Sequence, residues 1–326
     1  MSTKTRDFSV VICAYTEDRW DDLLSAVTSV RSQLLSPLEI IVVVDHNPVL
    51  LSRVRRELPR VIAVENTEPR GLSGARNSGI AAAHGEFVAF LDEDASAADD
   101  WLARLSDIYD DPKVMGAGGA VEPRWPGKRP RWFPKEFDWV VGCSYQGLPE
   151  AASPVRNLLG CNMSYRREVF ENIGMFTNGI GRVGLLPVGC EETEFCIRAH
   201  QFWPDRTLIY EPRAVVHHRV HSNRVSWGYF RDRCYSEGRS KALVSRLVGT
   251  GQGLASERIH ALRTLPLGVI RGFTDFLGGS DPMGVVRGGA IVTGLLCTAV
   301  GYLLGTVTRS PAHLRAEATS REALAL

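Results

Sequence analysis

The first 122 residues alternate between short apolar runs and longer segments of mixed polarity. The apolar runs have the length of strands and lie at residues 8–14, 38–44, 61–64, 86–91 and 114–121. The segments between them predict helices at residues 18–35, 48–58, 72–83 and 99–109. Strands that alternate with helices predict an α/β fold with a doubly wound, mostly parallel, Rossmann-like sheet. Right-handed crossovers would bring the strand ends to one edge of the sheet, at Ala14, Asp45, Asn66 and Asp92.

The run from Phe87 to Leu91 predicts a buried central strand, and three acids follow it directly: Asp92, Glu93 and Asp94. Ligands of open α/β sheets bind just outside the carboxyl ends of the strands. Three carboxylates repel one another there unless a cation lies among them. The sequence therefore predicts a metal site, and the alternative is a solvated acidic loop that caps the next helix.

Other polar side chains at the predicted edge of the sheet are of the types that bind a nucleotide. Tyr15 would lie against a base, Asp45 would bind the base or ribose, and Arg76 would lie near phosphate. Taken singly, Asp45 is also explained as a turn residue and Arg76 as a surface charge. No G-x-G-x-x-G follows the first strand and no G-x-x-x-x-G-K-[ST] occurs anywhere, so neither a dinucleotide-binding fold nor a P-loop is supported.

Six segments of the chain together resemble a known family. They read, in order, SVVICAYTEDRWDDLLSAVTSV, EIIVVVDHNP, PRGLSGARNSGIAAAHGEFVAFLDEDA, NLLGCNMSYRREVFENIGMF, GCEETEFCIRA and VVHHRV. This order resembles the family-2 inverting glycosyltransferases of GT-A fold, and the resemblance covers roughly residues 7–245. It implies that the D-x-D acids hold a divalent metal that bridges the diphosphate of a nucleotide-sugar.

The resemblance also implies a set of ligands. The metal would be Mn²⁺ or Mg²⁺, because oxygen ligands with one imidazole suit these ions better than zinc. Asp92, Asp94 and a histidine would hold it, and we expect His218 rather than His217. Glu93 should point the other way along the extended chain, although it belongs to the donor segment. The residues assigned to the nucleotide-sugar are Ala14, Tyr15, Glu17, Asp45, Arg70, Gly71, Arg76, Asp92 and Glu93.

Three glutamates after Gly189 stand at a predicted helix start: Glu191, Glu192 and Glu194. Inverting transfer needs a carboxylate that takes the proton of the acceptor hydroxyl. In the family pattern E-D-x-E, Glu192 replaces the aspartate that acts as base, and Glu191 is the alternative. The simplest explanation without catalysis is an acidic first turn stabilised by the helix dipole.

Residues 123–157 are rich in proline, tryptophan and basic side chains and lack a helix or strand period, which predicts a loop or lid over the site. Such side chains suit a sugar or a phosphate-bearing acceptor, although loop packing explains them as well. The candidate acceptor contacts are Trp139, Asn162 and Arg182.

The C-terminal third predicts helices of a different kind. Residues 222–249 are basic and aromatic, and residues 259–277 suit a helix on a membrane surface. Residues 288–307 carry no charge and are long enough for one membrane span, the alternative being a buried or dimerising helix. The segment is flanked by Arg287 and Arg309. Because the charges on the two sides are similar, the positive-inside rule does not predict its orientation in a membrane. The tail from Ser310 is polar and predicted to be mobile.

Composition narrows the function further. A formal net charge of +1 does not suit a nucleic-acid binder, and the seven cysteines form no C-x-x-C pair, which fits a reducing compartment. The polar N-terminus predicts no secretory signal. The expected organisation is a nucleotide-sugar half, an acceptor and catalytic half, membrane-associated helices and a tail, at residues 7–122, 123–245, 246–309 and 310–326.

The predicted function is therefore transfer of a sugar from a nucleotide-sugar, expected to be a UDP-sugar, to a lipid-linked or cell-envelope glycan. The predicted location is the membrane, with the catalytic domain in the cytoplasm. One alternative is a nucleotidyltransferase, although the Gly- and Lys-rich loop expected after the first strand is replaced by Tyr15-Thr16-Glu17-Asp18. The other is a membrane-anchored protein that binds a nucleotide-sugar without catalysis, supported only by the glutamate at position 192.

Overall fold

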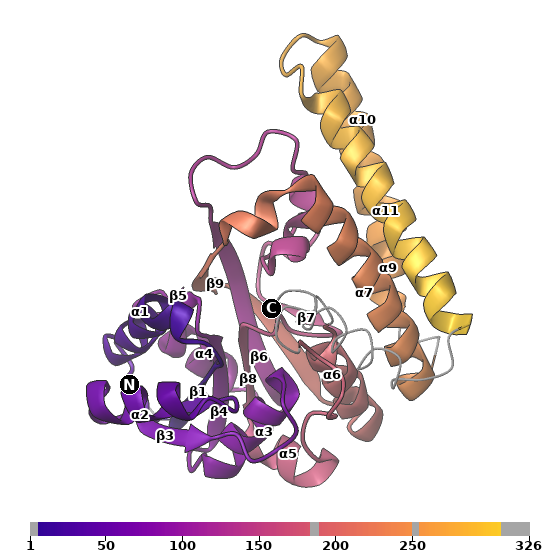
Figure 1. Ribbon diagram of the computed structural model, residues 1–326. Coiled ribbons are helices and arrows are strands. Elements are labelled where there is room, and N and C mark those ends of the chain that lie inside the picture. Colours follow the sequence, from indigo (N-terminus) through magenta and orange to yellow (C-terminus); the bar gives the residue numbers. More distant parts are fainter. Residues whose placement is uncertain (1–5, 183–188, 250–253, 308–326) are drawn as a thin grey trace.

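The structure is a computed structural model that describes residues 6–182, 189–249 and 254–307. Its N-terminal half contains four parallel strands in the order β3-β2-β1-β4 (Figure 1). The strands are β1 (Phe8–Ala14), β2 (Glu39–Val44), β3 (Ile62–Glu65) and β4 (Phe87–Asp92). The helices between them are η1 (Glu17–Arg19), α1 (Trp20–Arg31), α2 (Pro48–Glu57) and α3 (Leu72–Ala82). The predicted common edge of strand ends is confirmed, because the four strands run in the same direction.

The strand β4 is buried on both faces, as its apolar run predicted. Phe87 stacks on Phe8 with ring centroids 5.1 Å apart, in the core beneath α1 and α4 (Trp101–Ile108). Phe90 points to the opposite face and contacts Phe176 edge-on at 5.7 Å. Because successive side chains of a strand alternate between faces, this one run anchors two separate hydrophobic cores. The acids that follow β4 are therefore held by a rigid element.

The other half of the sheet differs from a simple parallel continuation. The order continues β4-β8-β6-β9-β5, and β7 pairs with β9. These strands are β5 (Ala95–Ala97), β6 (Val114–Arg124), β7 (Ser153–Val155), β8 (Asn162–Arg166) and β9 (Thr207–Arg219). The strand β8 is antiparallel to both β4 and β6, so the sheet is mixed, whereas β6 and β9 are parallel. Two helices, α5 (Arg167–Ile173) and α6 (Glu191–Phe202), pack beside this half.

The predicted lid at residues 123–157 is more ordered than its composition suggested. The strand β6 continues to Arg124, a 3₁₀ helix η2 spans Lys135–Val141, and β7 lies within the same segment. Arg129 forms two hydrogen bonds to Asp138, of 2.6 and 2.9 Å, and so ties the loop to η2. The expectation of a segment without helix or strand was wrong, because long-range pairing with β9 stabilises β7.

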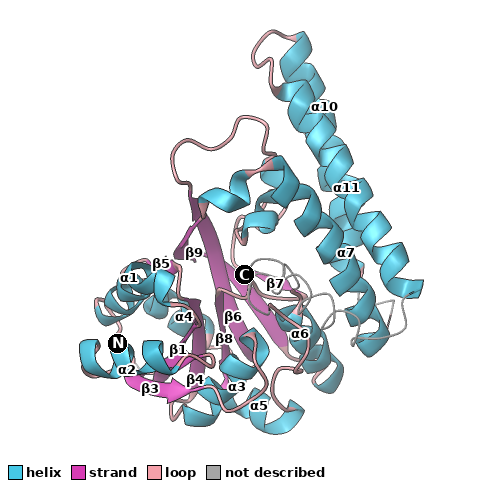
Figure 2. Ribbon diagram, viewed as in Figure 1, coloured by secondary structure: helices cyan, strands magenta, loops and turns pink. Residues whose placement is uncertain are grey.

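The C-terminal third is helical, as predicted. It contains η3 (Ser222–Val225), α7 (Trp227–Val248), α9 (Ala255–Ile259), one π-helical turn η4 (His260–Thr264), α10 (Leu265–Leu277) and α11 (Gly284–Val307). The helices α10 and α11 form a hairpin that projects from the domain (Figure 2). The predicted tail from Ser310 lies outside the described residues.

The helix α11 approaches α7 very closely. A Cβ atom on Gly238 of α7 would lie 2.0 Å from the carbonyl oxygen of Thr298, and one on Gly301 of α11 would lie 2.0 Å from that of Tyr235. Only glycine permits this backbone approach. Arg246 of α7 also donates hydrogen bonds to the last carbonyls of α11, at Gly305 and Thr306, both at 2.6 Å.

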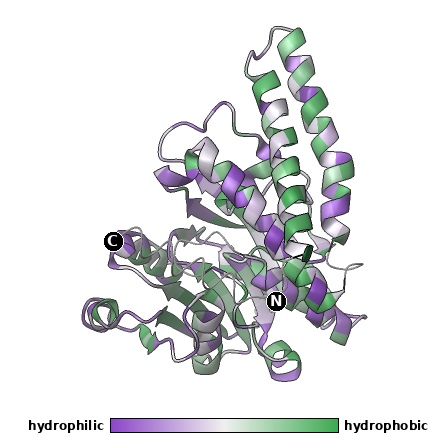
Figure 3. Cartoon of the chain, turned by 45° about the vertical axis from the view of Figure 1, so that its right-hand side comes forward, coloured by the Kyte–Doolittle hydropathy of each residue, from purple (hydrophilic) through white to green (hydrophobic). Residues whose placement is uncertain are grey.

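The hairpin is also rich in hydrophobic residues (Figure 3). Large exposed apolar side chains recur on α10 and α11: Leu267, Ile270, Phe273, Phe276, Leu277, Val292, Leu296, Val300, Leu303 and Leu304. Among the described residues, α11 is the one helix long and apolar enough to cross a membrane. This surface is consistent with membrane association, but it does not orient the chain.

Candidate active site

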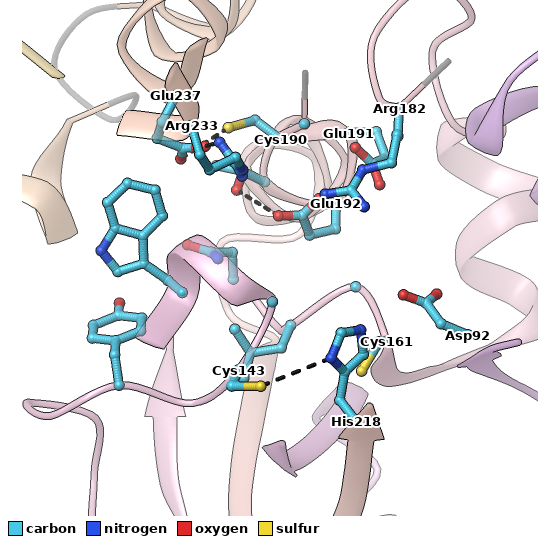
Figure 4. Close-up of a pocket in the computed structure, with 18 of the residues that line it drawn as sticks. Asp92, Cys143, Cys161, Arg182, Cys190, Glu191, Glu192, His218, Arg233 and Glu237 are labelled. Carbon is cyan, nitrogen blue, oxygen red and sulfur yellow. Dashed lines mark hydrogen bonds and ion pairs between the residues drawn. The ribbon is translucent and has the colours of Figure 1, made fainter. Parts of the chain in front are cut away.

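A cavity of about 590 Å³ opens at the carboxyl ends of β1, β2 and β4. It continues between α6 and the C-terminal helices. Most of the predicted site residues line it, namely Ala14, Tyr15, Asp45, Arg76, Asp92, Glu93, Asp94, Trp139, Arg182, Glu191, Glu192 and His218. In Figure 4, Arg182, Glu191 and Glu192 lie on one side of the pocket, and Asp92 and His218 lie on the other. The fold thus brings together residues more than 120 positions apart in sequence.

The candidate metal ligands form a compact cluster. One ligand atom each of Asp92, Asp94 and His218 lies within 4.8 Å of the others, and His218 Nε2 is 3.2 Å from an Asp94 oxygen. His217 points to the other face of β9, where its Nδ1 lies 3.5 Å from Glu122. The structure thus distinguishes the two histidines. Two carboxylates and one imidazole fit Mn²⁺ or Mg²⁺, with room in the cavity for the oxygens of a ligand.

Three basic residues that sequence reasoning missed surround Asp94. Arg19 Nη1 lies 3.2 Å from its carboxylate, His221 Nε2 lies 3.2 Å away and Arg224 Nη2 lies 3.7 Å away. Burial raises the pKa of Asp94, yet His218, His221 and Arg224 together hold it well below its usual value. His221 and Arg224 follow His218 at steps of three, and this spacing after a strand end was the available signal.

Glu93 does not point into solvent. Its side chain is buried, accepts a 3.0 Å hydrogen bond from Arg19 and a 3.3 Å bond from the backbone N–H of Tyr15. Burial, together with the neighbouring Asp94, raises the pKa of Glu93 to about 8, although Arg19 opposes this. Glu93 therefore fastens the loop after β1 to the acidic loop after β4, a structural role that the sequence did not predict.

Arg76 also has an unexpected role. It is buried, and its Nη1 donates to Glu191 at 2.8 Å, while its Nη2 donates to the carbonyl of Gly160 at 2.9 Å and lies 3.6 Å from Asp92. We predicted that Arg76 would lie near phosphate. Its donors join α3 to the start of α6, and they also bring it close to Asp92 at the end of β4, in the wall of the cavity.

At the start of α6, the carboxylates of Glu191 and Glu192 differ in burial and in hydrogen-bond partners. Its N-cap residue, Cys190, has a positive φ of 77°, a strained conformation for a residue with a Cβ atom. The Cys190 Sγ lies 3.2 Å from Glu237, which holds this turn. Glu191 is buried against Arg76, whereas Glu192 is half-buried in the cavity wall and accepts a bond of 3.3 Å from Thr193.

Glu192 has the electrostatics of a general base. Burial and, next, the neighbouring Glu191 raise its pKa to about 7, against the opposing effects of Arg76 and Lys241. A carboxylate with a pKa near neutrality accepts a proton more readily than an ordinary glutamate does. The other candidate for the base, Glu191, differs because one of its oxygens is held by Arg76.

The nucleotide side of the cavity is centred on Asp45. One of its oxygens accepts a 3.0 Å bond from the backbone N–H of Gly71, and the other accepts a 2.6 Å bond from Asn66. Gly71 thus orients Asp45 rather than lining the cavity. Glu17 and Arg70 are exposed and do not line the cavity, so these two predicted contacts are not supported.

The acceptor side contains two of its three predicted residues. Trp139 lines the cavity beside Arg233, whose guanidinium lies 5.5 Å from the indole centroid. Arg182 has no ion-pair partner within the described parts of the chain, and burial, then Arg224 and Arg233, lower its pKa. Asn162 is different, because it lies in the core, accepts from Trp101 and donates to two backbone carbonyls. Its placement does not support an acceptor role.

Sequence comparison now decides the family. The model described as glycosyl transferase family 2 matches residues 9–174, just over half of the chain. The chain belongs to this family. It is 35% identical over 243 residues to the glucosyl-dolichyl phosphate glucuronosyltransferase of Haloferax volcanii. This alignment covers 73% of this chain and 77% of the relative. It is 26% identical over 269 residues to the succinoglycan biosynthesis protein ExoM of Rhizobium meliloti, covering 81% and 80%.

The fold of this family-2 glycosyltransferase is similar to that of solved structures. The mannosyltransferase PcManGT from Pyrobaculum calidifontis, in complex with GDP-Man and Mn²⁺, matches with a TM-score of 0.57 at 18% identity, over 91% of this chain and 88% of that one. GalNAc-T7 with UDP, GalNAc and Mn²⁺ matches with a TM-score of 0.51 at 18% identity. This second match covers 72% of this chain and 48% of that one. The predicted GT-A-type fold is confirmed.

Proposed function

We propose that this glycosyltransferase moves a sugar, with inversion, from a UDP-sugar to a hydroxyl of a lipid-linked glycan. The observation that carries the proposal is Glu192, a carboxylate of raised pKa that faces the same cavity as the cluster of Asp92, Asp94 and His218. The relative that acts on a dolichyl-phosphate substrate supports the lipid-linked acceptor, and so does the apolar hairpin. Family membership argues against the nucleotidyltransferase alternative, and the glycosyltransferase relatives support an enzyme rather than a non-catalytic binding protein.

The chemistry follows from the arrangement of charges. Glu192 takes the proton of the acceptor hydroxyl, and the resulting oxygen nucleophile attacks the anomeric carbon from the face opposite the nucleotide. The bond to the diphosphate breaks as the new glycosidic bond forms, which inverts the configuration. Asp92, Asp94 and His218 would hold a divalent cation, which supplies positive charge to the leaving diphosphate when bound. Asp45 and Tyr15 would orient the nucleoside at the strand ends.

The pH dependence of transfer should report the ionisation of Glu192. The base acts when deprotonated, and its pKa is raised to about 7, so activity is lost as pH falls through this value. We expect kcat/KM to fall by about 10-fold per pH unit below pH 7. Nucleotide binding measured at each pH separates this effect from titration of the acids at the metal cluster. A flat profile between about pH 5.5 and 8 would contradict the assignment.

Nucleotide binding should depend on a divalent metal. We expect UDP at 100 times its Kd to stabilise the protein by about 2.7 kcal/mol in the presence of Mn²⁺, and much less in EDTA. The measurement is a thermal-shift series with UDP, GDP and their sugar derivatives. Asp94→Asn should abolish the Mn²⁺ dependence, whereas Asp205→Asn, at an exposed position, serves as the matched control. Equal stabilisation by UDP with and without EDTA argues against the metal, and a GDP preference overturns the proposed donor.

A further inference from the structure

The cavity extends beyond the catalytic carboxylate. Past Glu192 it is lined by residues of α9, η4, α10 and α11, namely Glu257, Ile259, His260, Thr264, Leu265 and Leu295. These are the helices that form the apolar C-terminal unit. The cavity therefore connects the carboxyl ends of the parallel strands with the underside of this unit. Transfer from a nucleotide-sugar to a small soluble sugar does not account for this extension.

A partly buried ionic cluster lies between Glu192 and these helices. Arg156 binds Glu257 through two hydrogen bonds of 2.6 and 2.7 Å, and Lys241 Nζ lies 2.7 Å from the same carboxylate. Arg233 pairs with Glu237 at 2.7 Å, and Lys241 also lies 3.5 Å from Glu237. All five side chains line the cavity.

The charge of this cluster is not balanced within it. It contains three cations and two carboxylates, and burial fails to neutralise the acids, since the neighbouring Arg and Lys side chains lower the pKa values of Glu237 and Glu257 to about 2. Arg156, Arg233 and Lys241 therefore line this part of the cavity beside two ionised carboxylates. Guanidinium and ammonium groups bind the oxygens of a phosphate through charge-assisted hydrogen bonds.

The apolar outer face begins where the cavity ends. Ile259 lines the cavity and is also 62% exposed, so it stands at the mouth. Leu262, one turn further along, is 77% exposed, and Leu267 and Ile270 continue the same apolar surface onto α10. The order from the inside outwards is thus a carboxylate base, a cationic cluster and an apolar surface.

We propose that this extension binds the phosphate of a polyprenyl-type lipid phosphate, with the lipid chain leaving past Ile259 along the exposed apolar face. The inference rests on the proposed function and specifies its acceptor site. The sugar hydroxyl of such an acceptor reaches Glu192, its phosphate meets the cluster of Arg156, Arg233 and Lys241, and its chain continues into the membrane. The three parts of the ligand match the three parts of the cavity in order.

Binding of farnesyl phosphate to the full chain tests this inference. We expect farnesyl phosphate to bind at least about 10-fold more tightly than either farnesol or inorganic phosphate, because each of these lacks one of the two contacts. Ile259→Asp and Leu262→Asp should weaken its binding by about 10-fold or more, without changing UDP binding in Mn²⁺. Both positions are exposed, so the fold tolerates the change. Leu34→Asp, exposed to the same 77% on the opposite half, is the matched control.

A second variant isolates the phosphate. Lys241→Met should weaken farnesyl phosphate about 10- to 100-fold and leave farnesol unchanged. Equal binding of farnesol and farnesyl phosphate, or unchanged binding in Ile259→Asp and Leu262→Asp, overturns the inference even if Lys241→Met does not fold. If UDP binds and farnesyl phosphate does not, only this inference fails. If neither UDP nor GDP binds, the proposed function fails as well.

Discussion

Replacing Glu192 with glutamine should lower the rate of sugar transfer by about 100- to 10,000-fold and leave UDP binding unchanged. Glutamine keeps the size of the side chain but cannot accept the proton of the acceptor hydroxyl. The half-buried position of Glu192 and its raised pKa make it the group that is poised to take this proton. The measurement is single-turnover transfer, with UDP affinity determined in parallel by thermal shift.

One control variant sharpens this test. Glu192→Asp restores the residue that the family pattern has at this position, and it keeps a carboxylate that is withdrawn by about 1 Å. We expect its rate of transfer to fall by at most about 100-fold, and so to exceed the rate of the glutamine variant. Near-normal turnover in Glu192→Gln would refute the assignment and return Glu191 to consideration as the base.

The variant Arg76→Met should destabilise the protein by about 3–5 kcal/mol, the usual effect of removing one partner of a buried ion pair. Arg76 is buried and compensates Glu191, which itself lies away from solvent. Without the guanidinium, a carboxylate is left uncompensated in the interior. The measurement is the free energy of unfolding from urea titration, provided that the denaturant slope stays constant.

The matched control for this variant is Arg70→Met, six residues earlier and exposed. We expect a change within about 0.5 kcal/mol there. The double variant Arg76→Met with Glu191→Leu should recover much of the lost stability, because an apolar pair of similar volume can replace a buried ion pair. An Arg76→Met protein as stable as the unchanged chain would show that the ion pair with Glu191 does not contribute to stability.

The sequence predicted those parts of the site that local pattern determines. The apolar runs gave the strands β1, β2 and β4, and parallel strands necessarily present their carboxyl ends at one edge. Asp45, Asp92 and Asp94 follow those runs directly, so their placement required no knowledge of tertiary contacts. The choice of His218 over His217 also follows from the alternation of side chains between the two faces of β9, once the pairing of this strand is known.

The rest of the site depends on long-range contacts that no local pattern records. Arg76 reads as an ordinary helix residue, and its partner Glu191 lies 115 positions further along the chain. Asn162 reads as a polar residue available for a ligand, but β8 inserts antiparallel between β4 and β6 and carries it into the core. The ion pair of Glu93 was not predicted for the same reason, because its partner Arg19 belongs to another element.

The close approach of α7 and α11 affects how the protein can be shortened. Gly238 and Gly301 bring the two backbones together, so α11 is part of the packing of the helix that carries Arg233, Glu237 and Lys241. A chain that ends before Gly284, as when an anchor is removed to improve solubility, therefore leaves that surface of α7 uncovered. Because α11 also lines the cavity, through Leu295 and Thr298, an active soluble form is better sought by polar substitutions on the outer face of α11.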